Sequence, residues 1–185
     1  MRLFVAVEMP VFQKVTEIYK AIEMSGADVK LVEPENLHIT LVFIGEVPDF
    51  KLNSIKEAVS SVTFKPFKVK LKGMGAFPSM TKPRVVWIGI EEGFTELRNI
   101  RDTLMKELKS RGIRPEDEKE FVPHLTLGRV KGPRNLYNLI NIINENSNVE
   151  IGEVNVDSIK LFKSTLTPKG PIYEVLHEVK GVAGN

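Results

Sequence analysis

The sequence predicts an α+β, bilobal duplicated fold in which two antiparallel sheets flank a central cleft and helices lie on the outside. Two observations lead to this prediction. The order strand, helix, strand, helix, strand occurs twice along the chain, which indicates a degenerate duplication. No low-complexity tract or flexible linker separates the two halves. We therefore expect a single two-lobed domain over residues 1–185, with lobes of roughly 1–80 and 81–185 and a final segment that can return to the first lobe.

Each predicted element has a local signature. Helices are indicated where apolar residues recur at intervals of three and four, as at Val11, Val15 and Ile18. Strands are indicated by short apolar and β-branched runs between turn residues, or by alternation with lysine, as over residues 67–71. The predicted helices cover residues 11–24, about 51–61, about 93–110 and about 133–145. The predicted strands cover residues 2–8, 29–32, 37–44, 66–72, 84–90 and 123–130, with further strands near 149–163 and 172–179. Residues 73–84, which hold two glycines and two prolines, are predicted to be a loop.

Composition and charge limit the class of protein. The 185 residues carry a net charge of +2 with a pI near 8.7, which permits a polyanionic partner but does not require one. The absence of cysteine excludes disulfides, thiolate nucleophiles and cysteine-ligated metal sites. No apolar run approaches the roughly 18 residues of a membrane span, and the charge at Glu8 interrupts the N-terminal apolar run too early for a signal peptide. We expect a cytoplasmic protein.

The motif His-x-Thr-Leu occurs twice, over residues 38–41 and 124–127. The chain has only three histidines and nine threonines, so random order would give roughly 0.15 His-x-Thr matches. On a strand, residues i and i+2 point to the same face, so each histidine shares a face with a threonine. The third histidine, His177, has no threonine at i+2 and is predicted to be a surface strand residue. The repeated motif predicts a site at which two matched arms converge.

Two imidazoles facing each other form an acid–base pair at neutral pH, because an unperturbed pKa of about 6.5 allows either protonation state. The hydroxyls of Thr40 and Thr126 supply neutral donors for an anion whose charge is shared among oxygens. Arg129 adds a guanidinium that fits a phosphate oxygen. Its odd offset from His124 places it on the wrong face of a regular strand unless Gly128 marks a bulge or the strand's end. The collected groups predict a metal-independent phosphodiester site.

This pattern resembles the two-histidine phosphoesterase superfamily. Within it, the chain is similar to the bacterial and archaeal RNA 2′,3′-cyclic phosphodiesterases, also called 2′-5′ RNA ligases. The resemblance covers nearly all 185 residues and extends beyond the two motifs. It rests on residues 2–7, 35–41, 83–87, 123–129 and 161–166.

The resemblance implies hydrolysis of an RNA 2′,3′-cyclic phosphate end to a 2′-phosphate. His38 would be the proton donor to the leaving 3′ oxygen, and His124 the proton acceptor that activates water, although the near symmetry of the site allows the reverse assignment. Thr40 and Thr126 would hold the non-bridging oxygens, with Arg129 as a supporting clamp. The reverse reaction, joining RNA ends in a 2′-5′ linkage without a nucleoside triphosphate, is also implied. We expect no cofactor and no metal, and a monomer, because a self-contained site needs no partner subunit.

Other basic and aromatic residues have two interpretations each. Arg84 and Trp87 are candidate substrate-binding residues, the tryptophan by stacking on a base. The apolar strand around Trp87 favours a core position for its ring. Lys68, Lys70 and Lys72 alternate along a predicted strand and would line a cationic RNA path or form a solvated sheet face.

Two other functions compete with the cyclic phosphodiesterase. One is a non-catalytic RNA-end or nucleotide-binding module, which does not need the proton donor and acceptor that the two motifs supply. The other is a hydrolase with His38 and His124 as metal ligands, but neither lies in a His-x-x-x-His or carboxylate-rich motif. A tRNA half, an oligonucleotide end and a small cyclic nucleotide present the same phosphate chemistry, so the sequence does not select among these substrates.

Overall fold

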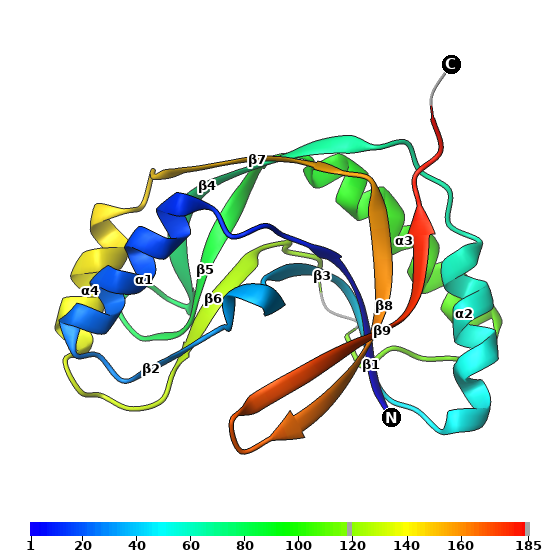
Figure 1. Cartoon of the computed structure of the whole chain (residues 1–185), viewed down its shortest axis with the longest axis horizontal. Helices are drawn as coiled ribbons and strands as arrows, with labels where there is room; N and C mark the ends of the chain where they lie inside the picture. The colour runs from blue at the N-terminus through cyan, green and yellow to red at the C-terminus, as the bar shows by residue number, and fades with distance from the viewer. Residues whose placement is uncertain (118–119, 184–185) are drawn as a thin grey trace.

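The computed structural model describes residues 1–117 and 120–183 (Figure 1). The helices are α1 (Gln13–Ser25), α2 (Leu52–Ser60), α3 (Phe94–Ser110) and α4 (Leu136–Glu145), with short 3-10 turns at Pro34–Asn36 and Asp49–Lys51. The strands are β1 (Arg2–Glu8), β2 (Val29–Leu31), β3 (His38–Glu46), β4 (Phe67–Pro78), β5 (Pro83–Glu92), β6 (Leu125–Val130), β7 (Glu150–Val156), β8 (Ser158–Thr167) and β9 (Gly170–Lys180).

The strands form a curled antiparallel sheet in the order β7-β4-β5-β6-β3-β1-β8-β9 (Figure 1). We call β3-β1-β8-β9 the first-motif arm and β7-β4-β5-β6 the second-motif arm, after the His-x-Thr copy that each contains. The arms are joined at the pairing of Ile39 on β3 with Leu125 on β6. Beyond this pair, β2 continues along the same edge of β6. The α+β duplicated fold predicted from the sequence is confirmed.

Each arm collects strands from both halves of the chain. β4 precedes residue 80 but pairs with β5 and β7 of the second-motif arm. β8 and β9 come last in the chain, yet β8 pairs with β1 and β9 pairs with β8 in the first-motif arm. The division near residue 80 therefore separates the two sequence repeats but not the two arms, because the repeats exchange strands.

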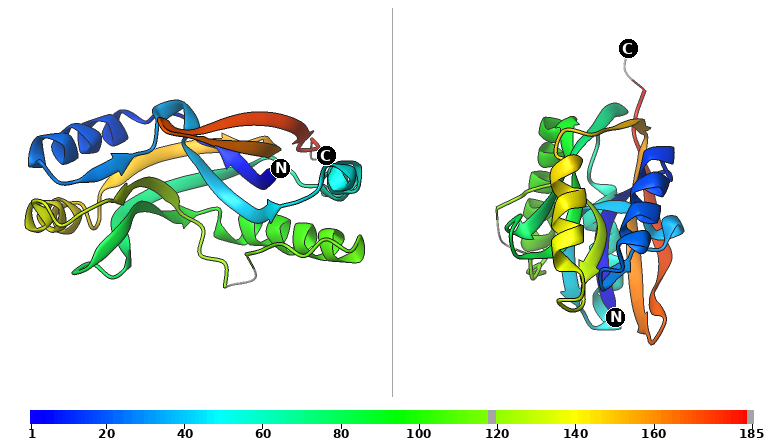
Figure 2. Two further views of the ribbon diagram at one scale, coloured as in Figure 1. Left: turned by 90° about the horizontal axis from the view of Figure 1, so that it is seen from below. Right: turned by 90° about the vertical axis from the view of Figure 1, so that its left-hand side faces the viewer.

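The helices cover opposite ends of the sheet. α1 packs against α4 at one end and α2 packs against α3 at the other, as Figure 1 and the left view of Figure 2 show. Alternation along β1 sends Leu3, Val5 and Val7 into one large core beneath the helices. Phe4 and Ala6 point to the other face, where they form a small cluster with Phe162. Among residues 1–117 and 120–183, every helix falls short of the length or the hydropathy that a bilayer-spanning segment requires.

The prediction of a loop over residues 73–84 is confirmed only for residues 79–82 and is wrong for residues 73–78, because β4 continues to Pro78 and β5 begins at Pro83. Gly75 does not turn the chain. It lies in the strand opposite Trp87, and a Cβ atom there would collide with the indole ring. Glycine in a strand can mark a close approach as well as a turn, and here it provides room for a large ring. The extended strand carries Phe77 toward the second His-x-Thr motif.

Candidate active site

His38 is the first residue of β3 and follows the 3-10 turn Pro34–Asn36. Its Nδ1 atom is 2.7 Å from the Asn36 carbonyl oxygen. A carbonyl only accepts hydrogen bonds, so Nδ1 carries a proton and Nε2 is the nitrogen that gains or loses one. Nε2 is 3.1 Å from the Thr40 Oγ1 atom, as expected for two residues on one face of a strand.

His124 repeats this arrangement directly before β6. Its Nδ1 atom is 2.7 Å from the Val122 carbonyl oxygen, again two residues earlier in the chain. The same ring nitrogen is therefore fixed as a donor in both histidines, and Nε2 is left for chemistry in both. The rings are half-buried, and each is held by backbone that the motif itself supplies.

The central pair of the sheet brings the two motifs together. Ile39 faces Leu125 in an antiparallel register. The residue before Ile39 therefore faces the residue after Leu125, and the residue after Ile39 faces the residue before Leu125. His38 is thus across from Thr126, and Thr40 is across from His124. Across this register, a protonated His124 acts to lower the pKa of His38, in addition to the larger effect of burial. The predicted convergence of the two copies is present.

A β-bulge follows each histidine. The β1–β3 register steps from Val5–Val42 to Ala6–Thr40, which leaves Leu41 as the extra residue. The β5–β6 register makes the same step around Leu127. A bulge reverses the side-chain alternation, so the residue five positions after each histidine returns to the site face.

That residue is Arg129 in the second motif and Phe43 in the first. Arg129 is exposed, and its charge lowers the pKa of His124. From its sequence position, Arg129 could face the site only if a bulge or the end of the strand lay near Gly128. The structure has such a bulge at Leu127, one residue before Gly128. A Cβ atom on Gly128 would be 2.9 Å from the Lys30 carbonyl oxygen, so glycine is needed here for the approach of β2.

The carbonyls of the two bulges are held by helices from opposite halves of the chain. Arg101 on α3 donates from Nη1 to the Leu41 carbonyl at 2.7 Å. The Leu127 carbonyl accepts from the Val32 amide at 2.8 Å, and the Tyr19 hydroxyl on α1 lies 3.3 Å away while donating to the Val32 carbonyl. Each repeat therefore supplies a helix that supports the motif of the other.

Arg101 also links α3 to the segment before His124. Its guanidinium bonds to Asp117, with 3.3 Å to Oδ2 and 3.1 Å to the carbonyl, and lies 5.0 Å from the centre of the Phe121 ring. Arg101 is buried, with 5% of its surface exposed. Our sequence reasoning missed it, although a signal was present. Arg101 occurs within the buried stripe of α3, between Leu97 and Leu104, where a charged residue is unusual.

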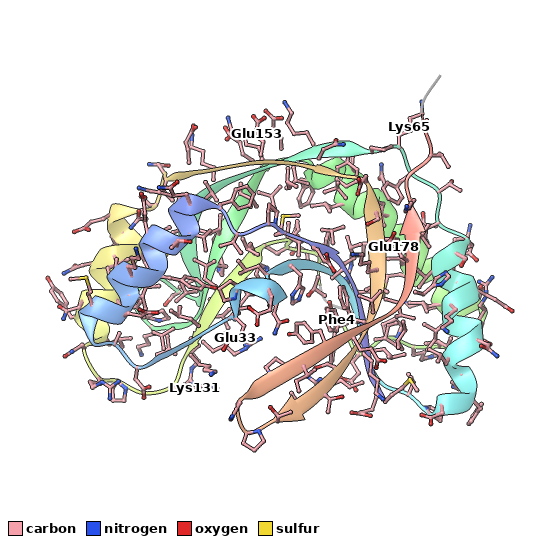
Figure 3. All side chains as sticks on the ribbon, in the orientation of Figure 1. Phe4, Glu33, Lys65, Lys131, Glu153 and Glu178 are labelled. Carbon is pink, nitrogen blue, oxygen red and sulfur yellow. The ribbon has the colours of Figure 1, made fainter. Side chains whose placement is uncertain are left out.

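Aromatic rings surround each histidine. The His38 ring lies 5.1 Å from Phe4 (labelled in Figure 3) and 5.5 Å, edge-on, from Tyr173. The His124 ring lies 5.1 Å, edge-on, from Phe77 and 6.4 Å from Trp87. Burial is the main cause that lowers the pKa of both histidines below the ordinary 6.5. The carbonyl that accepts from each Nδ1 opposes this effect but does not cancel it, so the net shift favours the neutral form of both imidazoles in the free protein.

The remaining residues singled out from the sequence lie in different surroundings, and only Trp87 is close to a motif histidine. Trp87 lies beside His124 and is half-buried, and its Nε1 is buried without a hydrogen-bond partner in the described part of the chain. Arg84 is exposed at an irregular position of the β4–β5 pairing, and within the described ranges no hydrogen bond, ion pair or ring contact joins it to either histidine. His177 is half-buried, and its Nε2 lies 2.6 Å from the Ser60 Oγ atom of α2.

The lysines of β4 form ion pairs. Lys68 pairs with Glu153 at 3.5 Å, and Lys70 pairs with Glu91 at 3.4 Å. Lys72 lies between two carboxylates, at 4.0 Å from Glu91 and 3.9 Å from Glu150. This pattern fits the solvated sheet face better than an open cationic path. The residues that the structure describes contain no cluster of three or more His, Asp or Glu side chains placed to bind a metal ion.

Comparison with known proteins agrees with this geometry. The chain matches the model of the LigT-like phosphoesterase family over residues 5–87 and again over 88–173. It is 49% identical over 180 residues to the RNA 2′,3′-cyclic phosphodiesterase of Archaeoglobus fulgidus, covering 95% of this chain and 98% of the relative. It is 46% identical over 170 residues to the protein of that name from Aeropyrum pernix, covering 92% and 96%.

Solved structures show the same fold. The crystal structure of TT0787 of Thermus thermophilus superposes with a TM-score of 0.71 at 32% identity, covering 97% of both chains. The structure of E. coli LigT complexed with 3′-AMP has a TM-score of 0.72 at 22% identity, also covering 97% of both chains, which is a likeness of fold.

The duplicated antiparallel sheet and its facing pair of His-x-Thr motifs define an enzyme of the two-histidine phosphoesterase class. The two family-model matches span nearly the whole chain, one for each repeat. The chain belongs to the LigT-like phosphoesterase family.

Proposed function

We propose that this phosphoesterase hydrolyses RNA 2′,3′-cyclic phosphate ends to 2′-phosphates by acid–base catalysis between His38 and His124. The observation that carries the proposal is the matched tautomer of the two rings. In both rings Nδ1 is committed to a backbone carbonyl, which leaves Nε2 as the nitrogen that can exchange a proton. The names of the relatives from Archaeoglobus fulgidus and Aeropyrum pernix support the choice of substrate.

In the proposed reaction a water molecule attacks the cyclic phosphorus and gives its proton to Nε2 of neutral His124. The new phosphorus–oxygen bond forms as the bond to the 3′ oxygen breaks, and Nε2 of protonated His38 gives its proton to that oxygen. The products are a 2′-phosphate and a 3′-hydroxyl. Proton exchange with solvent then returns both rings to their starting states. The cation of Arg129 favours the neutral form of His124, which supports the role of this histidine as the base.

Thr40 and Thr126 are assigned to the non-bridging oxygens of the phosphate. In the free protein Thr40 is hydrogen-bonded to Nε2 of His38. When that nitrogen becomes protonated it no longer accepts, and the hydroxyl proton is released for a phosphate oxygen. Arg129 would neutralise the phosphate from the second-motif arm. A 5′-hydroxyl in place of water would give a 2′-5′ linkage by the same steps.

Trp87 is the aromatic ring we assign to nucleotide contact. Its position beside His124 and the unpartnered Nε1 atom support this assignment. Arg84 lacks comparable contacts, and the structure adds no support to its predicted role in substrate binding.

The proposal is tested with a short RNA that ends in a 2′,3′-cyclic phosphate, incubated with the protein and excess chelator. We expect complete conversion to the 2′-phosphate, resolved from the 3′-phosphate by chromatography. The same RNA with a 3′-phosphate end is the control and should remain unchanged. Formation of the 3′-phosphate would contradict the assignment of the leaving oxygen. Loss of turnover that added divalent metal restores would contradict the metal-independent mechanism.

The pH dependence of kcat/KM follows from the lowered pKa of both histidines. Activity needs His38 protonated and His124 neutral. Because burial lowers the pKa of His38 below 6.5, kcat/KM should be highest at acidic pH and should already be falling when the pH reaches 6.5. The measurement is kcat/KM from about pH 4.5 to about pH 9 at constant ionic strength.

The variant Arg129→Met provides the control for this profile. Removing the cation raises the pKa of His124, so the acid limb, on which the base becomes protonated, should move to higher pH. A profile that keeps rising above neutral pH in the wild-type protein would contradict the assignment.

A further inference from the structure

A second guanidinium lies on the site side of the first-motif arm. Arg2 on β1 is half-buried, and its guanidinium carbon lies 4.7 Å above the centre of the Phe43 ring. Phe43 is the residue that the Leu41 bulge returns to the site face, the counterpart of Arg129 in the second motif. The first-motif arm therefore places an aromatic ring with a cation stacked on it where the second-motif arm places a cation alone.

Tyr173 connects this cation to the candidate catalytic pair. Its ring meets His38 edge-on at 5.5 Å and packs against Phe4 at 4.9 Å. Burial raises the pKa of the Tyr173 hydroxyl, while the charges of Arg129 and Arg2 both act to lower it. The two guanidiniums, which come from different arms, thus both lie within electrostatic reach of one hydroxyl beside His38.

The ion pairs of the described residues distinguish these two guanidiniums from the other cations near the sheet. Within residues 1–117 and 120–183, neither Arg2 nor Arg129 has a carboxylate within 4.0 Å, whereas all three lysines of β4 do. A cation stacked on an aromatic ring, with no ion pair to neutralise it, is suited to bind a phosphate group. Arg129 supplies a second cation from the other arm, so the two charges together provide for more than one phosphate beside the catalytic pair.

We propose that Arg2, supported by Phe43 and Tyr173, forms a second phosphate subsite. It takes the phosphate on the 5′ oxygen of the nucleotide whose cyclic phosphate lies between the two histidines. The inference rests on the proposed function and deepens it, because it makes the end of a polynucleotide the preferred substrate over a cyclic nucleoside monophosphate. In a chain, this 5′ phosphate is the phosphodiester next to the end.

The test compares three substrates of the same base. They are a 2′,3′-cyclic nucleoside monophosphate, the same molecule with a 5′-phosphate, and a dinucleotide that ends in the cyclic phosphate. We expect the wild-type protein to prefer the second and third. Arg2→Met should lower kcat/KM for these two by roughly 10- to 100-fold, the range for a lost charge-assisted bond, and should leave the first unchanged. The slope of log kcat/KM against log salt for the dinucleotide should decrease by about one.

The matched control is Arg98→Met, which removes the same charge from an exposed position on α3. It should leave kcat/KM unchanged for all three substrates. Arg2→Lys should recover part of the loss, because lysine restores the charge but not the two parallel N–H donors of the guanidinium. An Arg2→Met variant that affects all three substrates equally, or none, would overturn the subsite. The subsite would also be overturned if Arg2→Met lowered kcat/KM for the dinucleotide but not for the 5′-phosphorylated cyclic monophosphate. The 5′-phosphate would then not be the group that Arg2 recognises.

The outcome separates the subsite from the function on which it rests. If the wild-type protein hydrolyses none of the three substrates, the proposed function fails. If it hydrolyses the cyclic monophosphate and gains nothing from the 5′-phosphate, only the subsite fails.

Discussion

Alanine in place of His124 is expected to lower kcat on a 2′,3′-cyclic RNA end by roughly 10²- to 10⁴-fold, the usual contribution of a general acid or base. The ring is half-buried at the edge of β6, and its Nδ1 hydrogen bond is to the Val122 carbonyl, which water can satisfy after the substitution. The fold should therefore persist. Single-turnover kinetics measures the chemical step, and circular dichroism during thermal unfolding checks the fold.

Two further variants complete this test. The double variant of His38 and His124 should be little worse than either single variant, because residues that act as one unit lose activity together. His177→Ala is the matched control, since this histidine bonds to Ser60 away from both motifs and should leave turnover intact. A folded double variant with wild-type turnover would disprove the two-histidine mechanism.

Replacing Arg101 with methionine is expected to reduce both stability and turnover. The Leu41 carbonyl would lose its donor, and a buried acceptor without a donor costs about 1–3 kcal/mol of the free energy of unfolding. For a chain of this size the melting temperature should decrease by roughly 2–12 °C. The bulge that orients His38 and Thr40 and the segment that leads to His124 would both lose a contact, so kcat should decrease by roughly 10- to 100-fold with little change in KM.

The control variant is Arg111→Met, at the C-terminal end of the same helix. Arg111 pairs with Glu107 at 2.7 Å and is close to Glu57, but it contacts neither motif in the described part of the chain. Its loss should affect stability without affecting kcat below the melting temperature. Equal kcat values for the two variants would show that Arg101 only stabilises the fold and does not position the motifs.

Much of the fold could be predicted from local pattern. Val15 and Ile18, spaced as on one face of a helix, are buried in α1 as predicted, whereas Val11 precedes the helix and is exposed. Residues 73–78 were predicted to be a loop but form part of β4, because glycine and proline occur both in turns and at special positions within strands. Gly75 is small to accommodate Trp87 on the neighbouring strand, and nothing within residues 73–78 alone reports that neighbour.

The candidate site could be predicted in part for a similar reason. The two His-x-Thr copies are local, and a strand places each pair on one face whatever surrounds it. The orientation of Arg129 depended on the bulge at Leu127, which is set by the register between β5 and β6. Phe4, Tyr173 and Phe77 surround the histidines only because strands distant in sequence pair with one another.

The sequence by itself determined the duplicated α+β class, the two histidines and their threonines, because these follow from periodicity and from a motif that occurs twice. Only the tertiary structure decided that the two repeats exchange strands. It also decided that α1 and α3 each support the other repeat's motif, that Arg101 is buried, and that Arg2 stacks on Phe43. The physical reason is that strand register, bulges and burial are set by contacts between residues far apart in the chain, and no local pattern encodes which partner a strand will have.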